Sequence, residues 1–231
     1  MRRSLIALGA LAATAALTLL SGGANAALVC GTTQVVTSGQ VITGPFTPSE
    51  CFQAGDKLFG DFSGTGGSGA AALSFTFSGF GNVTLGITDS ISNTGTTNIT
   101  ATLHYQVAVT AAGLAAGWRI DDITKDPTFN QFDSTGAVAE VILQGVSPEA
   151  GFNITCTRHE PTAVGDNCPV HTTFAPVTTM TVNETATVFP NTVVTGLTDT
   201  ISQVQRVPEP ASLGLLGAGL LGLGLLARRR R

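Results

Sequence analysis

Apolar and polar residues alternate along much of the chain with a period of two. The clearest stretch has an apolar register made of Ile99, Leu103, Tyr105, Val107 and Val109. Its polar register is made of Thr100, Thr102, His104, Gln106 and Thr110. Shorter stretches alternate in the same way and carry apolar residues at Leu73, Phe75, Phe77, Val83, Leu85 and Ile87. This pattern predicts β-strands with one buried and one solvent-exposed face.

Further segments of the same character predict more strands, at residues 57–63, 118–124, 138–143, 152–157, 174–182 and 193–204. Gaps that contain Gly, Asn or Pro separate them, and no long amphipathic helix is visible. This spacing predicts an all-β fold, an antiparallel β-sandwich over residues 27–206. The twelve phenylalanines all lie in this part and would fill the space between the sheets.

The two ends of the chain have a different character. Arg2 and Arg3 precede an uncharged run, and the small residues Ala24 and Ala26 follow it, which predicts a secretory signal peptide at residues 1–26 that is cleaved before Ala27. Residues 211–227 carry no charge, which predicts a transmembrane helix. The arginines that follow predict a cytoplasmic tail, and they are Arg228, Arg229, Arg230 and Arg231. We therefore expect an exported ectodomain.

Charge excludes one class of partner. The ectodomain keeps five of the eleven basic residues but every acidic residue except Glu209. An acidic surface repels phosphate backbones and gains nothing from counterion release, so we expect no binding to nucleic acid.

A proline-rich segment joins the ectodomain to the apolar run. Its residues are Val207, Pro208, Glu209, Pro210, Ala211 and Ser212. The prolines lack N–H donors and favour an extended, exposed segment that suits the groove of another protein. Together with the apolar run and the arginines, this segment resembles the PEP-CTERM sorting signal of Gram-negative bacteria that export polysaccharide.

That resemblance implies how the protein is processed and sorted. Exosortase, a polytopic membrane transpeptidase, would recognise Pro208, Glu209 and Pro210, remove the helix and pass the protein from the inner membrane to the cell surface or extracellular matrix. The alternative is a plain single-pass anchor whose prolines are a spacer. The segment GDKLFGDFS (residues 55–63) also resembles a recurrent ectodomain of PEP-CTERM proteins that has no assigned role.

The four cysteines all lie in the exported part, where disulfides are the default. Three pairings are possible, and we expect the local one, Cys30 with Cys51 and Cys156 with Cys168, because short loops cost least entropy to close. Cys156 and Cys168 are each followed three residues later by a histidine, His159 and His171. These four side chains could bind zinc, but only if the cysteines were reduced thiolates.

A group of oxygen-bearing side chains is a second candidate metal site, and it consists of Asp121, Asp122, Asp126, Asn130 and Asp133. Turn signals at Asp126-Pro127 and Gly136 suggest a loop, in which calcium could bind, but the spacing lacks the D-x-D-x-D-G pattern. No catalytic motif is present. We therefore expect no enzymatic activity, no metal and no cofactor.

The leading hypothesis is a structural or interaction protein linked to exopolysaccharide or biofilm. A first rival is a carbohydrate-binding or adhesive module that uses Tyr105 or Trp118 as stacking platforms. A second rival is a secreted hydrolase whose site is assembled from distant residues, such as the acidic group and a histidine.

Overall fold

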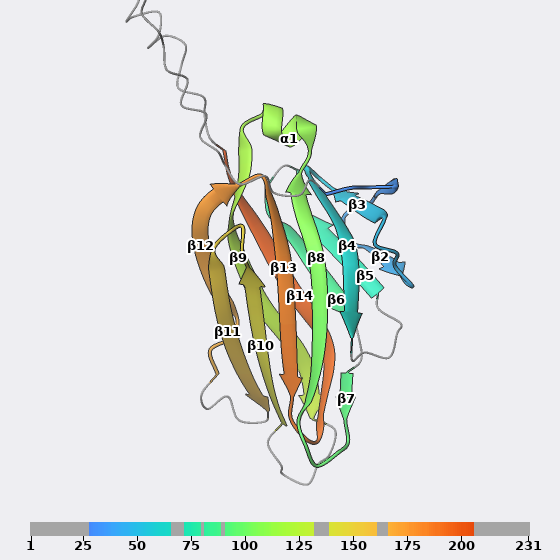
Figure 1. Ribbon diagram of the computed structural model, residues 1–231, viewed down its shortest axis with the longest axis vertical. Helices are drawn as coiled ribbons and strands as arrows, with labels where there is room; N and C mark the ends of the chain where they lie inside the picture. Colours follow the sequence, from blue (N-terminus) through green and yellow to red (C-terminus); the bar gives the residue numbers. More distant parts are fainter. Residues whose placement is uncertain are drawn as a thin grey trace, which may run out of the picture.

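The computed structural model describes residues 28–65, 72–79, 81–88, 91–131, 139–160 and 166–205. In these ranges the chain forms two seven-stranded sheets and one short helix, α1 (Ala111–Ala115) (Figure 1). The first sheet has the order β1 (Thr32–Val35), β3 (Glu50–Ala54), β4 (Lys57–Thr65), β8 (Ile99–Val109), β13 (Thr179–Val188), β10 (Ala139–Ser147), β11 (Phe152–Glu160). The second has the order β12 (Val170–Val177), β9 (Trp118–Gln131), β14 (Thr192–Gln205), β6 (Val83–Thr88), β5 (Ala72–Phe77), β2 (Gln40–Thr43), and β7 (Ile91–Asn93) also pairs with β14. The all-β prediction is confirmed.

Strand pairing is antiparallel throughout the described residues, apart from the parallel pair β1 and β3. The two longest ladders join β8 to β13 in the first sheet and β9 to β14 in the second. Side chains from these four strands contact one another across the space between the sheets. The sheets therefore form two layers with the central strands of each facing the other.

Where apolar and polar residues alternate in the sequence, buried and exposed residues alternate in the structure. Along β8, Tyr105 and Val107 are buried, whereas Thr100 and Thr102 are exposed. Leu73 and Phe75 of β5 and Val83, Leu85 and Ile87 of β6 are likewise buried, and Phe77 is half-buried. A strand places successive side chains on opposite faces, so one face of each sheet supplies the core.

Aromatic rings fill the space between the sheets. Phe75 of the second sheet lies between Phe59 and Phe52 of the first, with ring centroids 5.2 Å and 6.0 Å away. At the other end of the sheets, Phe152 of β11 lies 5.5 Å from Phe174 of β12. These contacts join strands that do not share a backbone ladder, which is how two twisted sheets are held face to face.

The single strand expected at residues 174–182 is wrong. The chain there forms the end of β12 and the beginning of β13, which belong to different sheets. The β12–β9 ladder is irregular between Thr173 and Val177, and this interval contains Pro176, which has no N–H to donate. Thr178, between the two strands, instead accepts a hydrogen bond from the Val109 amide at 2.9 Å. Alternation alone does not reveal that a chain changes sheets.

The strands β1, β2, β3 and β7 were not predicted. β1 is exposed along its whole length and β2 alternates only between exposed and half-buried residues, so neither has the apolar register that marks a half-buried strand. β1 and β2 lie at the edges of their sheets, and β7 spans only Ile91–Asn93. The exposed edge strands bury too little to leave a pattern in the sequence, β7 is too short to show a period, and β3 buries the consecutive residues Cys51 and Phe52 instead of alternating.

Among the described residues, no helix is long and apolar enough to cross a membrane. The predicted signal peptide with its cleavage residues Ala24, Ala26 and Ala27 lies outside the described residues, as does the predicted transmembrane helix at 211–227.

Candidate functional site

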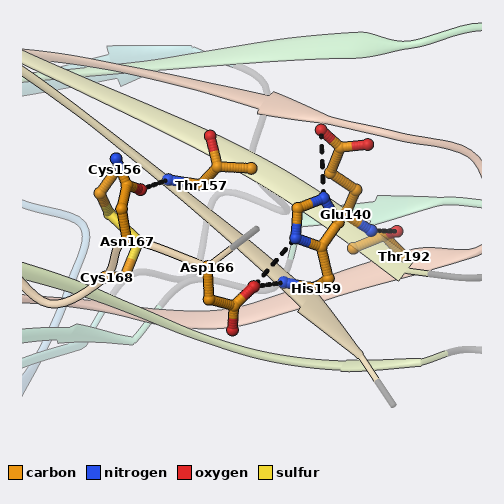
Figure 2. Close-up of polar contacts among 8 residues, drawn as sticks. All are labelled: Glu140, Cys156, Thr157, His159, Asp166, Asn167, Cys168 and Thr192. Atoms are coloured by element: carbon orange, nitrogen blue, oxygen red, sulfur yellow. Dashed lines mark hydrogen bonds and ion pairs between the residues drawn. A yellow bond between two sulfur atoms is a disulfide. The ribbon is translucent and has the colours of Figure 1, made fainter. Parts of the chain in front are cut away.

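The cysteine and histidine set lies where β11 and β12, edge strands of different sheets, are joined (Figure 2). Cys156 is bonded to Cys168, with their Cα atoms 5.1 Å apart, and Cys30 is bonded to Cys51. The local pairing is confirmed. Because both sulfurs of the first pair are used in a disulfide, they are not thiolates, and the zinc set does not form.

The two histidines of that set have separate carboxylate partners. His159 Nδ1 lies 2.9 Å from Asp166 Oδ1, and its Nε2 lies 3.7 Å from Glu140 Oε1 (Figure 2). The backbone N–H of His159 donates to the same Asp166 oxygen at 2.7 Å. His171 instead pairs with Asp122 of β9. The contacts of His159 fasten the segment before β12 to β11, and the contact of His171 joins β12 to β9.

Asp121, Asp122 and Asp126 of the acidic group lie in β9 and not in a loop. β9 continues through Asp126-Pro127, where a turn was expected, because Pro127 lies past the residues that pair with β12 and its missing N–H is tolerated there. Asp126 binds Arg158 at 2.9 Å, and partial burial together with the charge of Asp122 raises the pKa of Asp121. The Asn130 side chain and Asp133 lie outside the described residues. In the described part of the chain, no three His, Cys, Asp or Glu side chains gather as a metal site.

The proposed stacking residues do not form an open aromatic platform. Tyr105 is fully buried, and its hydroxyl donates to Asp199 rather than facing solvent. Trp118 is half-buried and packs against the core. Of the side chains that the structure describes, the large hydrophobic ones that are exposed are Val29, Val35 and Val41.

A buried cluster of charge between the sheets was missed by the sequence analysis. Lys125 of β9 pairs with Glu184 of β13 and lies 2.8 Å and 2.9 Å from the two carboxylate oxygens of Asp199 on β14. Tyr105 of β8 completes the cluster through its hydroxyl. The four side chains are at most 2% exposed. Hydrogen-bonded charge therefore lies in the middle of an apolar core.

Strand register brings these residues together. Lys125 and Asp199 are direct partners in the β9–β14 ladder, and Glu184 lies opposite Gly145 in the β13–β10 ladder. Gly145 leaves room for the lysine, because an added Cβ would lie 2.7 Å from Lys125 Cδ. The sequence contained a signal for the cluster, because two acidic residues occupy the apolar register of their strands. In that register, Glu184 lies between Val182 and Ala186, and Asp199 lies between Leu197 and Ile201.

Burial and the neighbouring charges in this cluster favour a proton on Glu184. Burial raises the pKa of Glu184 to about 8, and the charge of Asp199 adds to this, while Lys125 opposes it. Burial alone would lower the pKa of Lys125, but the charges of Asp199 and Glu184 raise it. Burial also raises the pKa of Tyr105 far above its ordinary value, so the phenol stays protonated. The raised pKa values therefore favour a protonated Glu184 beside the ammonium of Lys125.

The other lysine of the chain is also buried. Lys57 donates to the carbonyl oxygen of Gly81 and lies 3.4 Å from Asp56 Oδ1, and both charged side chains are 0% exposed. Burial lowers the pKa of Lys57 to about 8, against the charge and hydrogen bond of Asp56. Thus both lysines in the sequence are inside the protein.

Comparison with known proteins adds the decisive observation for the C-terminal segment. Residues 206–231 match the family model of the PEP-CTERM protein-sorting motif. The chain carries a PEP-CTERM sorting motif. This motif implies an exported protein that is held in the membrane before processing and is sorted by exosortase. No curated protein matches the chain.

The PEP-CTERM motif follows directly on β14. The strand ends at Gln205, whose side-chain amide donates to the Ala116 carbonyl at 3.0 Å, and the match begins at the next residue. β14 pairs with β9 on one side and with β6 and β7 on the other. The sorting segment is thus attached to a central strand, while its own predicted recognition residues and the arginines Arg228 to Arg231 lie outside the described residues.

The disulfide between β11 and the segment before β12 is expected to stabilise the folded state. Its cysteines are 12 residues apart, and loops of this size restrict the unfolded chain by about 2–3 kcal/mol. Urea unfolding of Cys156→Ala/Cys168→Ala should show a loss of that order, whereas the exposed neighbour change Thr155→Ala should lose less than about 0.5 kcal/mol. Equal stability of the double variant and the unchanged protein would contradict this role.

Gly145→Ala tests the close approach of Lys125 to the first sheet. The added methyl group would overlap the lysine stem, and overpacking of this kind costs about 1–3 kcal/mol of unfolding free energy. Gln144→Ala, at the adjacent exposed position, is the control and should change stability by less than about 0.5 kcal/mol. Denaturant titration of both variants gives the comparison, and an unaffected Gly145→Ala would show that Lys125 does not fill this space.

Lys57 should make stability depend on pH in the alkaline range. Its pKa is about 8 in the folded state and has the ordinary value of 10.5 in the unfolded chain, so the unfolded chain binds more protons between these values. The unfolding free energy of the unchanged protein minus that of Lys57→Met should therefore rise by about 3 kcal/mol from pH 8 to pH 10.5. Denaturant unfolding at stepped pH measures it; a difference that stays constant or falls would refute the lowered pKa.

Proposed function

We propose that this protein is delivered by exosortase to the cell surface or extracellular matrix, where its β-sandwich serves as a structural or interaction module. The observation that carries the proposal is the PEP-CTERM motif at residues 206–231, placed directly after a disulfide-bonded β-sheet body. Export provides the oxidising conditions in which such disulfides persist.

The body has features that suit a passive role outside the cell. Its acidic and hydroxyl-rich surface favours solubility, and its charged core residues are paired with one another. The histidines at 159 and 171 are engaged with carboxylates that fasten the β12 segment. These contacts support a structural role over a catalytic one, and we propose that the protein is not an enzyme. Exopolysaccharide of the matrix is the partner class that this location would offer.

The sorting step can be tested in the native host by the mass and cellular fraction of the protein. With exosortase present, the mature protein should lack residues 1–26 and the apolar C-terminal run and should be found outside the inner membrane. In a strain without exosortase, the C-terminal run should be retained and the protein should stay in the membrane fraction.

A pair of matched variants assigns this processing to the motif. Glu209→Ala/Pro210→Ala should reproduce the membrane-retained form in the presence of exosortase. Glu160→Ala/Pro161→Ala removes the same dipeptide elsewhere in the chain and should leave processing unchanged. An intact C-terminal run in every strain would contradict sorting and leave a permanently anchored domain.

A further inference from the structure

We propose that Lys125 and Asp199 condense into an intramolecular amide bond between Nζ and Cγ, with Glu184 transferring the protons. This cross-link concerns the body of the protein and does not depend on the sorting function. It would covalently join β9 to β14, two neighbouring inner strands of the second sheet.

The geometry places the reacting atoms together. Lys125 Nζ lies at nearly equal distances, 2.8 Å and 2.9 Å, from the two oxygens of Asp199, so it faces the carbon between them. Register pairing of the two residues and the lack of a side chain at Gly145 hold the lysine stem in this position. An oriented pair of this kind reacts as if each group were present at very high concentration.

The surroundings favour amide over free ions. Lys125, Asp199 and Tyr105 are each 0% exposed, so the water that would hydrolyse an amide is excluded from the site. Burial of an ammonium and carboxylates carries a desolvation cost, which is relieved when two of the charges are lost in forming a neutral amide. The Tyr105 hydroxyl donates to Asp199 Oδ2, where negative charge develops in the transition state.

Glu184 is placed to move the protons. It contacts the lysine nitrogen directly, and its carboxyl group lies within hydrogen-bonding reach of Asp199. Its Oε2 is buried and has no hydrogen-bond partner. With a pKa of about 8, the group can both give and accept a proton near neutral pH. Glu184 can therefore protonate Asp199 and accept a proton from the ammonium of Lys125, leaving a neutral amine beside a neutral acid.

The reaction then balances without any other reagent. The amine lone pair forms the C–N bond at Cγ, and the carbonyl electron pair moves onto the oxygen that Tyr105 contacts. The protonated Glu184 gives its proton to the departing hydroxyl group, which leaves as water, and the resulting carboxylate of Glu184 takes a proton from the nitrogen. The sum is one ammonium and one carboxylate converted to one amide and one water, with Glu184 restored to its starting form.

The bond would also protect the strand that leads to the sorting segment. Tension applied beyond Gln205 reaches Asp199 along β14 and would pass through the amide to β9. Even if the hydrogen bonds between the two strands broke, the chain could then not be extended past Asp199 unless the amide itself broke.

Peptide mapping of the full chain, purified after export, tests the proposal. After denaturation, reduction and alkylation, trypsin should fail to cleave after Lys125, because an acylated lysine is not a substrate. Further digestion after glutamate separates Glu184 from Asp199 when Glu184 is unmodified. The expected product joins the Lys125 peptide to the peptide of residues 185–206 and is lighter than their sum by one water. Complete release of an unmodified peptide ending at Lys125 would overturn the proposal, and so would linkage at Glu184.

Three variants report on the roles of the groups. Lys125→Arg keeps the charge but lacks the amine nucleophile, so trypsin should cleave after residue 125 and no linked peptide should form. Asp199→Asn should still give the same amide, with ammonia lost in place of water. Glu184→Gln should lower the linked fraction at least tenfold after equal times; an undiminished fraction would exclude Glu184 as the proton carrier. The mapping of the unchanged protein remains decisive if any variant fails to fold.

Discussion

Lys125 is held between two carboxyl groups in the buried space between the sheets. This lysine constrains the arrangement of the strands around it. Removing an ammonium from water is costly unless opposite charge and hydrogen bonds meet it at short range. Lys125 meets these conditions only where β9, β13 and β14 lie in their observed registers. A slip of one residue would turn a charged side chain to the other face and leave its partners uncompensated.

The remaining features of the body are consistent with a protein that works outside the cell. Phenylalanine side chains pack between the sheets, and disulfides fasten the segments that precede β1 and β12. The strand that contributes Asp199 to the cluster is the strand from which the PEP-CTERM motif continues. The PEP-CTERM segment therefore continues from a strand that takes part in the charged cluster.

Much of this architecture can be predicted from the sequence. Residues such as Leu85 and Val107 reveal half-buried strands because burial on one face imposes a period of two. The disulfide pairing follows from export and loop entropy, and the sorting motif is a contiguous segment that needs no fold to be recognised.

The charged cluster could not be assembled in the same way. Glu184 and Asp199 break the apolar register visibly, but the partner of each is set by strand order, which alternation does not encode. For the aspartates of β9, the local sequence suggested a turn where the structure has a strand. Asp126-Pro127 looks like a turn locally, yet the neighbouring strands hold it extended, and its carboxylate pairs with Arg158.

The state of the Lys125 side-chain nitrogen is the most direct test of this account. The chain has two lysines, so labelling lysine with nitrogen-15 at Nζ gives one signal from Lys125 and one from Lys57 as an internal reference. If Lys125 is linked to Asp199, it gives a slowly exchanging amide correlation with a single proton, and Lys57 gives an amine or ammonium signal. Two amine or ammonium signals would contradict the cross-link, and a Lys125 nitrogen that exchanged as rapidly as one in water would contradict the buried cluster itself.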